Sequence, residues 1–284
     1  MKLVTFRDSG TDRVGVVLGD EIADLSAVKP ELVDMVDLIA RGDGGLAAAG
    51  DRIERAPKLP STDVELRAPF IPRKNVMAVG RNYREHIHEI KDEPRPVPEN
   101  PIIFTKPPTS VIGPGEAIDT ANDPSGTTDY EGELGVVIGP GGIRIRAEDA
   151  WDHVYGYTIV NDVTARALQR KHGQWLIGKG PDTFCPMGPV VVTKDEIADV
   201  SSLWVRTSVN GEERQAAPVS DMVFDIPTLI ATLSSVMTLE PGDVIATGTP
   251  AGVGMGMEPP VFLAPGDVVE VSIDGIGTLT NPVI

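Results

Sequence analysis

The sequence predicts a mainly β, α+β fold. Glycine and proline are abundant, at 30 and 25 of the 284 residues, and this density suits many short strands joined by tight turns better than a helical bundle. Pro-Gly pairs at 114–115, 241–242 and 265–266 each precede a strand-like segment. Glycine supplies the positive φ that a type II turn needs.

The first 66 residues predict a small N-terminal α/β domain. Short apolar segments at 2–6, 13–19 and 21–26 are separated by turn-forming residues and indicate strands. Residues 30–42 predict a helix that ends at Gly42. The extended, proline-broken stretch that follows is typical of a linker, so we expect the domains to span 1–66 and 67–284.

The larger domain is rich in strands from residue 74 onward, with three predicted helices at 147–153, 164–173 and 225–242. In the third helix, Asp225 can cap the N-terminus. The apolar residues of this helix recur at helical spacing and predict a stripe that faces the core: Ile226, Leu229, Ile230, Leu233, Val236 and Met237.

Composition excludes several classes of function. The net charge of −17 argues against nucleic acid or an anionic membrane as a partner, because both need a basic surface. Cys185 is the single cysteine, so an intrachain disulfide and a multi-thiolate zinc site are excluded. No stretch resembles a signal peptide or a membrane helix. We therefore expect a soluble, cytoplasmic protein.

An acidic strand is the most unusual feature of the sequence. In "TTDYEGELGVVIG" (127–139), Asp129, Glu131 and Glu133 alternate before an apolar run, and side chains two apart share one face of a strand. Such carboxylates repel each other unless one is protonated or a cation lies between them. Oxygen ligands without nearby His or Cys favour Mg²⁺, Mn²⁺ or Ca²⁺ over Zn²⁺. The alternative is the solvated face of an edge strand.

Other stretches carry candidate functional residues. Asp162 follows a predicted strand and precedes a helix, so it is either a third metal ligand or a helix N-cap. His86 and Glu89 are three residues apart, which on a helix makes them either a surface ion pair or a dyad in which Glu89 raises the basicity of His86. A proline-rich segment within 80–104 is typical of an active-site lid. Lys179 lies in a Gly/Pro-rich loop.

Five motifs resemble, in order, the fumarylacetoacetate hydrolase family. The resemblance covers residues of about 75 to 275, and the N-terminal unit also fits the longer members. The motifs are "GRNYREHIHE", "DYEGELGVVIG", "GYTIVNDVTARALQ", "GKGPDTFCPMGP" and "ATGTPAGVG". The resemblance implies a mixed β-roll catalytic domain with few helices and a homodimer that binds Mg²⁺ or Mn²⁺.

The resemblance also implies roles for individual residues. Glu131, Glu133 and Asp162 match the metal ligands of the family, whereas Asp129 matches none. His86 and Glu89 match a lid dyad that activates water, and Lys179 matches a lysine that faces the substrate. Arg81, Gln169 and Thr249 match positions that hold substrate.

We expect from this a Mg²⁺- or Mn²⁺-dependent hydrolase that cleaves a C–C bond in a 2,4-dioxo acid. Candidate substrates are an acylpyruvate, fumarylpyruvate and a 2,4-dioxo-3-deoxy sugar acid. The negative charge of the enolate would be stabilised where it develops. An oxaloacetate-type decarboxylase and a 2-hydroxyhepta-2,4-diene-1,7-dioate isomerase are alternatives on the same site. A non-catalytic, metal-stabilised binding protein is a further one.

Overall fold

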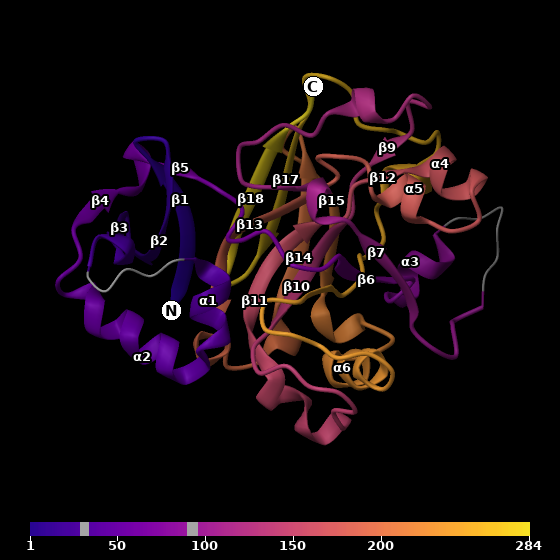
Figure 1. The fold of residues 1–284 in the computed structure, drawn as a ribbon. Coiled ribbons are helices and arrows are strands. Elements are labelled where there is room, and N and C mark those ends of the chain that lie inside the picture. Colours follow the sequence, from indigo (N-terminus) through magenta and orange to yellow (C-terminus); the bar gives the residue numbers. More distant parts are fainter. Residues whose placement is uncertain (29–33, 90–95) are drawn as a thin grey trace.

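The computed structural model describes residues 1–28, 34–89 and 96–284 (Figure 1). Twelve strands of the described residues form one large sheet. The order along its main path is β4 (Lys58–Pro60), β3 (Glu21–Asp24), β2 (Thr11–Leu18), β1 (Lys2–Asp8), β13 (Cys185–Thr193), β11 (Val154–Asn161), β10 (Gly132–Ile138), β16 (Val244–Ala246), β6 (Val76–Gly80) and β7 (Ile102–Lys106). Two short strands pair with β1 and β13 at the side of this path: β5 (Glu65–Leu66) and β8 (Val111–Ile112).

Two smaller sheets complete the β structure, so the predicted mainly β, α+β class is confirmed. One has four antiparallel strands in the order β15 (Glu212–Pro218), β14 (Trp204–Val209), β17 (Val268–Ile273) and β18 (Gly277–Pro282). The other pairs β12 (Thr164–Ala165) with β9 (Thr128–Asp129). The three expected Pro-Gly turns are present, since Gly115, Gly242 and Gly266 all have positive φ.

The described helices are short. They are α1 (Met35–Ala40), α2 (Gly42–Ile53), α3 (Arg84–His88), α4 (Arg166–Lys171), α5 (Leu176–Lys179) and α6 (Ile226–Ser234). The helix predicted at 147–153 is a 3₁₀-helix over Ala147–His153. The helix predicted at 164–173 starts later, at Arg166, because residues 164 and 165 pair with β9.

Helix α6 has the expected cap but a shorter apolar stripe than expected. The Asp225 side chain accepts a hydrogen bond from the backbone N–H of Thr228 at 2.9 Å. The stripe is buried only as far as Leu233. Val236 and Met237 are 78% and 44% exposed, so their prediction as core residues is wrong. The helix ends at Ser234, and beyond its end the 3.6-residue period no longer directs side chains to the core.

The N-terminal unit contains the three predicted strands as β1, β2 and β3. Part of the helix predicted at 30–42 lies outside the described residues. Its described part forms α1, which ends at Ala40, and Gly42 begins the next helix, α2, instead of ending the predicted one. Strand β1 pairs with β13 through Leu3 and Val191, so these strands continue the large sheet. The expected boundary near residue 66 stays a prediction.

Strand β10 lies inside the large sheet, between β11 and β16, and is buried along its whole length. On one face, Leu134 and Val136 pack with residues of the four-stranded sheet. On the other face, Val137 packs in a second apolar cluster that includes residues of α1 and α2. The alternative of a solvated edge strand is therefore wrong.

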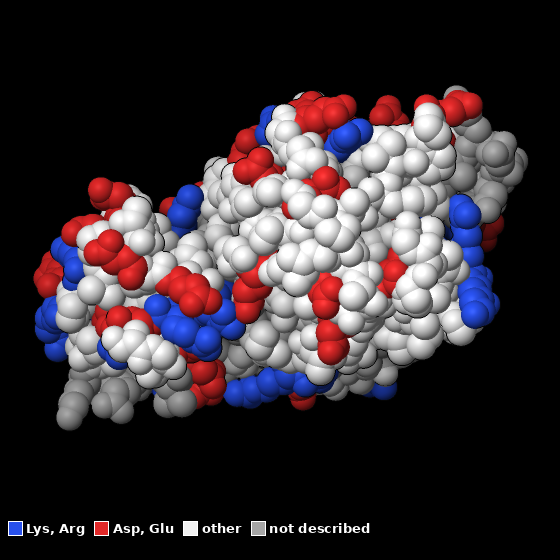
Figure 2. All heavy atoms as spheres, turned by 90° about the horizontal axis from the view of Figure 1, so that it is seen from above, with Lys and Arg blue, Asp and Glu red and all other residues white. Residues whose placement is uncertain are grey.

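No helix in the described part of the chain is long and apolar enough to cross a membrane. Figure 2 shows acidic side chains over the N-terminal unit and along the upper edge of the larger part, and basic side chains at its right and lower edges. This distribution agrees with the net charge of −17.

Candidate active site

The antiparallel pairing of β10 with β11 explains how three acids meet. Gly132 lies opposite Asn161 and Glu133 opposite Val160. One step further, the backbone N–H of Asp162 donates to the carbonyl oxygen of Glu131 at 2.8 Å. Cross-strand neighbours point to the same face of a sheet. The end of β11 therefore places Asp162 beside the two glutamates at the start of β10.

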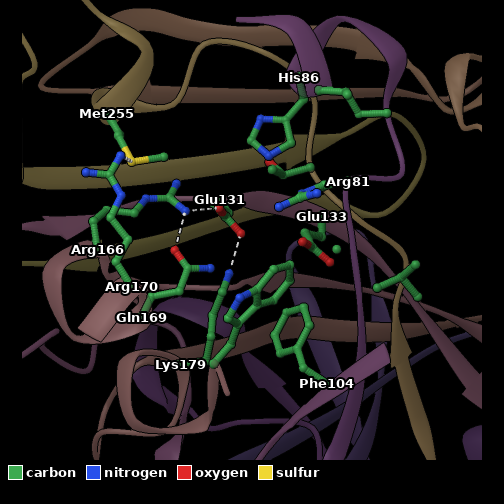
Figure 3. Close-up of a pocket in the computed structure, with 15 residues that line it drawn as sticks. Arg81, His86, Phe104, Glu131, Glu133, Arg166, Gln169, Arg170, Lys179 and Met255 are labelled. Carbon is green, nitrogen blue, oxygen red and sulfur yellow. Dashed lines mark hydrogen bonds and ion pairs between the residues drawn. The ribbon is translucent and has the colours of Figure 1, made fainter. Parts of the chain in front are cut away.

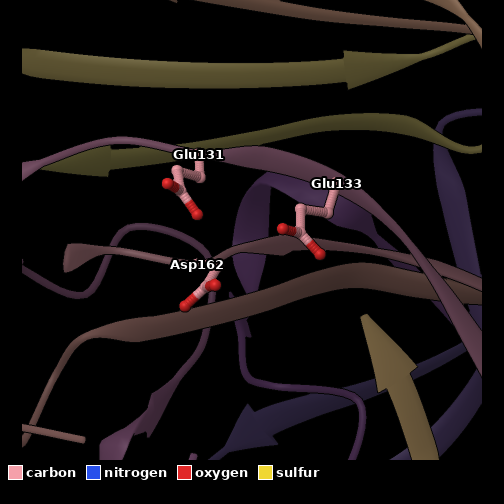
Figure 4. A group of neighbouring side chains, drawn as sticks. All are labelled: Glu131, Glu133 and Asp162. Carbon is pink, nitrogen blue, oxygen red and sulfur yellow. The ribbon is translucent and has the colours of Figure 1, made fainter. Parts of the chain in front are cut away.

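Glu131, Glu133 and Asp162, which we call the acid triad, form a buried cluster (Figure 4). One carboxylate oxygen of each lies within 4.8 Å of those of the others. Asp162 is not a helix N-cap, because Ala165 occupies that position of α4. Asp129 lies outside the cluster, as the resemblance implied.

Two cationic side chains compensate the charge of Glu131. Lys179 Nζ lies 2.6 Å from Glu131 Oε2 and 2.6 Å from Asp162 Oδ2, and Arg166 lies 2.6 Å from Glu131 Oε1. Burial alone would raise the pKa of Glu131, but the charges of Arg166 and Lys179 outweigh it and hold the pKa well below its usual range. Glu131 is therefore ionised in the folded protein.

Asp162 has a second lysine. Lys106 at the end of β7 is fully buried, and its Nζ lies 2.7 Å from Asp162 Oδ1. Its ammonium also donates to the carbonyl oxygens of Val163, at 3.0 Å, and Lys179. A buried ammonium needs such partners, because removing its charge from water is costly.

Glu133 is the least compensated of the triad. Its Oε2 accepts a hydrogen bond from the backbone N–H of Gly248 at 2.8 Å, and no cation of the described residues forms an ion pair with it. Burial, followed by the charges of Asp162 and Glu131, raises the pKa of Glu133 well above its usual value. A divalent cation between the three carboxylates would remove this penalty.

The donor set fits a hard divalent cation. All three ligands are carboxylate oxygens, which suit Mg²⁺ and Mn²⁺. Glu133 is buried beside two other acids without an ion pair among the described residues, and a cation at this position would explain that arrangement. The residues present therefore fit the predicted metal site.

Asp129 has a supporting position instead of a ligand position. Its Oδ2 accepts from Arg166 Nε at 2.8 Å and from the backbone N–H of Met255 at 3.0 Å, and its Oδ1 accepts from the N–H of Gly254 at 2.8 Å. It thus fixes Arg166 against Glu131 and holds the loop that follows Thr249.

The predicted pair of His86 and Glu89 lies at the pocket. His86 is on α3, and its Nδ1 contacts Glu89 Oε1. The other carboxylate oxygen of Glu89 accepts from the backbone N–H of Gly252 at 2.8 Å. Since Glu89 occupies Nδ1, Nε2 is the ring nitrogen left for a substrate. The role of this pair in activating water or moving a proton stays a prediction. Residues 90–95, which include the first part of the predicted lid, lie outside the described residues.

One pocket joins these groups (Figure 3). It is lined by the predicted residues Arg81, His86, Glu131, Glu133, Gln169, Lys179 and Thr249. Asp162 lies behind Lys179 and is not part of the lining. Lys179 is the last residue of α5, so helical structure rather than a loop positions it.

Two of the three predicted substrate-binding residues, Arg81 and Thr249, differ in whether their polar side-chain atoms already have hydrogen-bond partners. The guanidinium of Arg81 lies 5.9 Å from the ring centroid of Trp175, and its Nε is buried without a hydrogen-bond partner among the described residues. Arg81 also has a φ of 58°, a left-handed conformation uncommon for such a residue. Thr249 Oγ1 already donates to the carbonyl oxygen of Gly132 at 2.9 Å and accepts from Gln215 at 2.7 Å.

Sequence reasoning missed several residues of the site. Lys106 and Arg166 compensate the acids, and Phe104, Arg170, Trp175 and Met255 line the pocket. Lys106 gave one usable signal, since it ends an apolar strand where a charged residue needs a partner. The others are brought in by contacts between distant segments, which local patterns do not show.

Comparison with known proteins agrees with this geometry. Residues 75–284 match the family model described as fumarylacetoacetate (FAA) hydrolase C-terminal. Oxaloacetate tautomerase YisK of Bacillus subtilis is 48% identical over 95% of this chain and 95% of that protein. The mitochondrial oxaloacetate tautomerase fahd2 of Xenopus laevis is 43% identical over 100% of this chain and 90% of that protein.

Solved structures share the whole fold. A fumarylacetoacetate hydrolase from Exiguobacterium antarcticum has a TM-score of 0.88 at 43% identity, covering 100% of this chain and 99% of its own. Maleylpyruvate hydrolase from Sphingobium sp. SYK-6, in complex with manganese(II) and pyruvate, has a TM-score of 0.82 at 34% identity, with the same coverage.

Fold and site together define an enzyme with a metal-binding acid triad. The chain belongs to the fumarylacetoacetate hydrolase family, as its five motifs indicated.

Proposed function

We propose that this protein is a metal-dependent tautomerase that interconverts the keto and enol forms of a 2-oxo acid, with oxaloacetate as substrate. The observation that carries the proposal is the meeting of acid triad, Lys179 and the His86–Glu89 pair at one pocket. The two relatives named as oxaloacetate tautomerases support the choice of reaction.

Glu131, Glu133 and Asp162 would hold Mg²⁺ or Mn²⁺, which would withdraw electrons from the 2-oxo group and acidify the hydrogens at C3. The remaining chemistry falls to side chains. In the keto-to-enol direction, His86 Nε2 takes a proton from C3, and the electron pair of that C–H bond forms the C2–C3 double bond. The C2 oxygen gains the negative charge.

Lys179 stabilises that charge and passes a proton to the C2 oxygen. His86 then releases its proton to solvent and Lys179 takes one up, so both groups return to their starting state. Burial alone would lower the pKa of Lys179, but Asp162 and Glu131 outweigh it and raise the pKa. The ammonium therefore stays charged near neutral pH, when the oxyanion develops. The reverse direction uses the same groups, and no water is consumed.

Hydrolysis of a C–C bond in a 2,4-dioxo acid is the second candidate. The His86–Glu89 contact favours it, because a hydrolase needs a group that removes a proton from water. Hydrolases among the similar structures also support it. Decarboxylation of oxaloacetate and isomerisation of a hydroxydienoate would pass through a similar enolate and stay predictions, as does the homodimer.

A direct comparison of substrates tests the proposal. The enol of oxaloacetate is added to Mg²⁺-loaded enzyme, and the keto form is consumed at once by malate dehydrogenase and NADH. Acceleration of this conversion, without faster release of pyruvate from an acylpyruvate, is the expected result. Pyruvate release without acceleration of tautomerisation would replace the proposal with the hydrolase.

A further inference from the structure

Two arginine side chains that line the pocket have no carboxylate partner among the described residues. Arg81 contacts the face of Trp175 and leaves its Nε without a hydrogen bond. Arg170 donates from its Nη2 to Met255 Sδ at 3.0 Å, and a thioether is only a weak acceptor. Arg166, by contrast, forms ion pairs with Asp129 and Glu131.

In the view of Figure 3, Arg81 and Arg170 lie on opposite sides of Glu131. Figure 3 shows Arg81 beside Glu133 and below His86, whereas Arg170 lies beside Met255, beyond Arg166. The spacing of residues along α4 explains the position of Arg170. Arg166 and Arg170 are four residues apart, which places them on one face, about 5–6 Å apart between Cβ atoms. Arg170 therefore continues, by one helical turn, the line that starts at Glu131.

We propose that Arg170 binds the distal carboxylate of the substrate and so restricts the enzyme to dicarboxylic 2-oxo acids. The inference rests on the proposed function for the reacting end of the substrate, and it adds the residue that selects the substrate class. The guanidinium exchanges its thioether contact for a charge-assisted hydrogen bond to a carboxylate. Arg81 remains for the end of the substrate that all 2-oxo acids share.

The net charge of the protein supports a separate arginine for the distal carboxylate. A protein with a net charge of −17 repels a dianion at long range. Binding a second carboxylate therefore requires a local cation that no protein carboxylate neutralises. Among the described residues no carboxylate pairs with Arg170, and its exposed position at the rim of the pocket leaves room for the end of a longer acid.

Binding of two matched ligands that cannot enolise tests the proposal without tautomerisation. 3,3-Difluoro-oxaloacetate carries the distal carboxylate, and 3,3-difluoro-2-oxobutanoate carries a methyl group in its place. Affinities of both are measured by calorimetry with Mn²⁺-loaded wild type, Arg170→Met, Arg170→Lys and Lys171→Met. Lys171 is the exposed neighbour on α4 that does not line the pocket, so its variant has the same change in net charge.

Arg170→Met is expected to weaken the diacid by about 10-fold or more, the usual effect of one hydrogen bond to a charged group, and to leave the monoacid unchanged. Arg170→Lys recovers part of the loss, and Lys171→Met changes neither ligand. An equal loss of both ligands, or no loss of the diacid, would overturn the proposal. Because neither ligand can enolise, a protein that is not a tautomerase still gives a clear answer.

Discussion

The backbone N–H of Asp162 donates to the carbonyl oxygen of Glu131 at 2.8 Å. This bond joins the end of β11 to the start of β10 and sets the third acid beside the first. Both residues are buried, and Lys179 bridges their carboxylates. The metal site thus depends on strand register, because a shift by one residue would turn the glutamates to the other face.

Glu131→Gln should lower the affinity for Mn²⁺ and the activity together, because the amide lacks the charge of a carboxylate ligand. We expect a loss of at least about 100-fold in affinity, above that usual for outer-shell residues, measured by calorimetry. Asp152→Asn removes an exposed acid outside the site and serves as the control. An unchanged Mn²⁺ titration in Glu131→Gln would remove this residue from the site.

Glu133→Gln should stabilise the metal-free protein and abolish stabilisation by Mn²⁺. Burial and the neighbouring acids raise the pKa of Glu133 above its unfolded value. The stability of metal-free wild type therefore falls as pH rises from about 4.3 through the raised pKa, whereas a glutamine does not titrate. Melting temperatures with a chelator, measured over pH, should show a gap in favour of the variant that widens as pH rises.

A gap that is constant over pH would contradict the raised pKa of Glu133. Glu131 does not disturb this comparison. Its pKa is held low by Arg166 and Lys179, so its contribution to stability is lost only at pH values below its unfolded pKa.

His86→Ala should reduce kcat by about 100-fold or more, the usual contribution of a general base, with Mn²⁺ affinity unchanged. Glu89→Gln should cost less, because the amide can still accept from the N–H of Gly252. His88 is exposed on the same helix and does not line the pocket, so His88→Ala is the matched control. Equal rates for His86→Ala and wild type would exclude the proposed proton transfer.

Lys106→Met should destabilise the fold by about 3–5 kcal/mol, the usual cost of breaking a buried ion pair. The change leaves Asp162 Oδ1 and the carbonyl oxygen of Val163 without their cation. Chemical denaturation measures the loss. Lys171→Met, at an exposed position, should change the free energy of unfolding very little. A similarly small effect for Lys106→Met would show that the buried Asp162 does not depend on this ion pair for stability.

The acidic strand shows how much of the site the sequence could predict. The period of two along residues 129–133 placed Glu131 and Glu133 on one face, and the structure confirms that they lie together. Asp162 required more, because it follows a different strand, and the sequence pattern left it as either a third ligand or a helix N-cap until the resemblance joined it to the glutamates. The three-residue spacing predicted the contact of His86 with Glu89, because residues three apart on a helix are neighbours.

Other parts depend on contacts that no local pattern contains. Arg166 reaches Asp129 through the pairing of β12 with β9, and that pairing also delays the start of α4. Lys179 owes its position to a short helix hidden in a Gly/Pro-rich stretch. In the sequence, Val236 continues the apolar period of α6, but in the structure the helix ends at Ser234.

The rate of enol-to-keto conversion of oxaloacetate tests the central claim most directly. It should be accelerated by wild type with Mg²⁺ or Mn²⁺, should fall to the uncatalysed rate with a chelator, and should fall by about 100-fold or more in His86→Ala. The His86→Ala protein must still bind Mn²⁺ for the comparison to hold. Acceleration that survives both the chelator and the loss of His86 would contradict an active site built from the acid triad and this histidine.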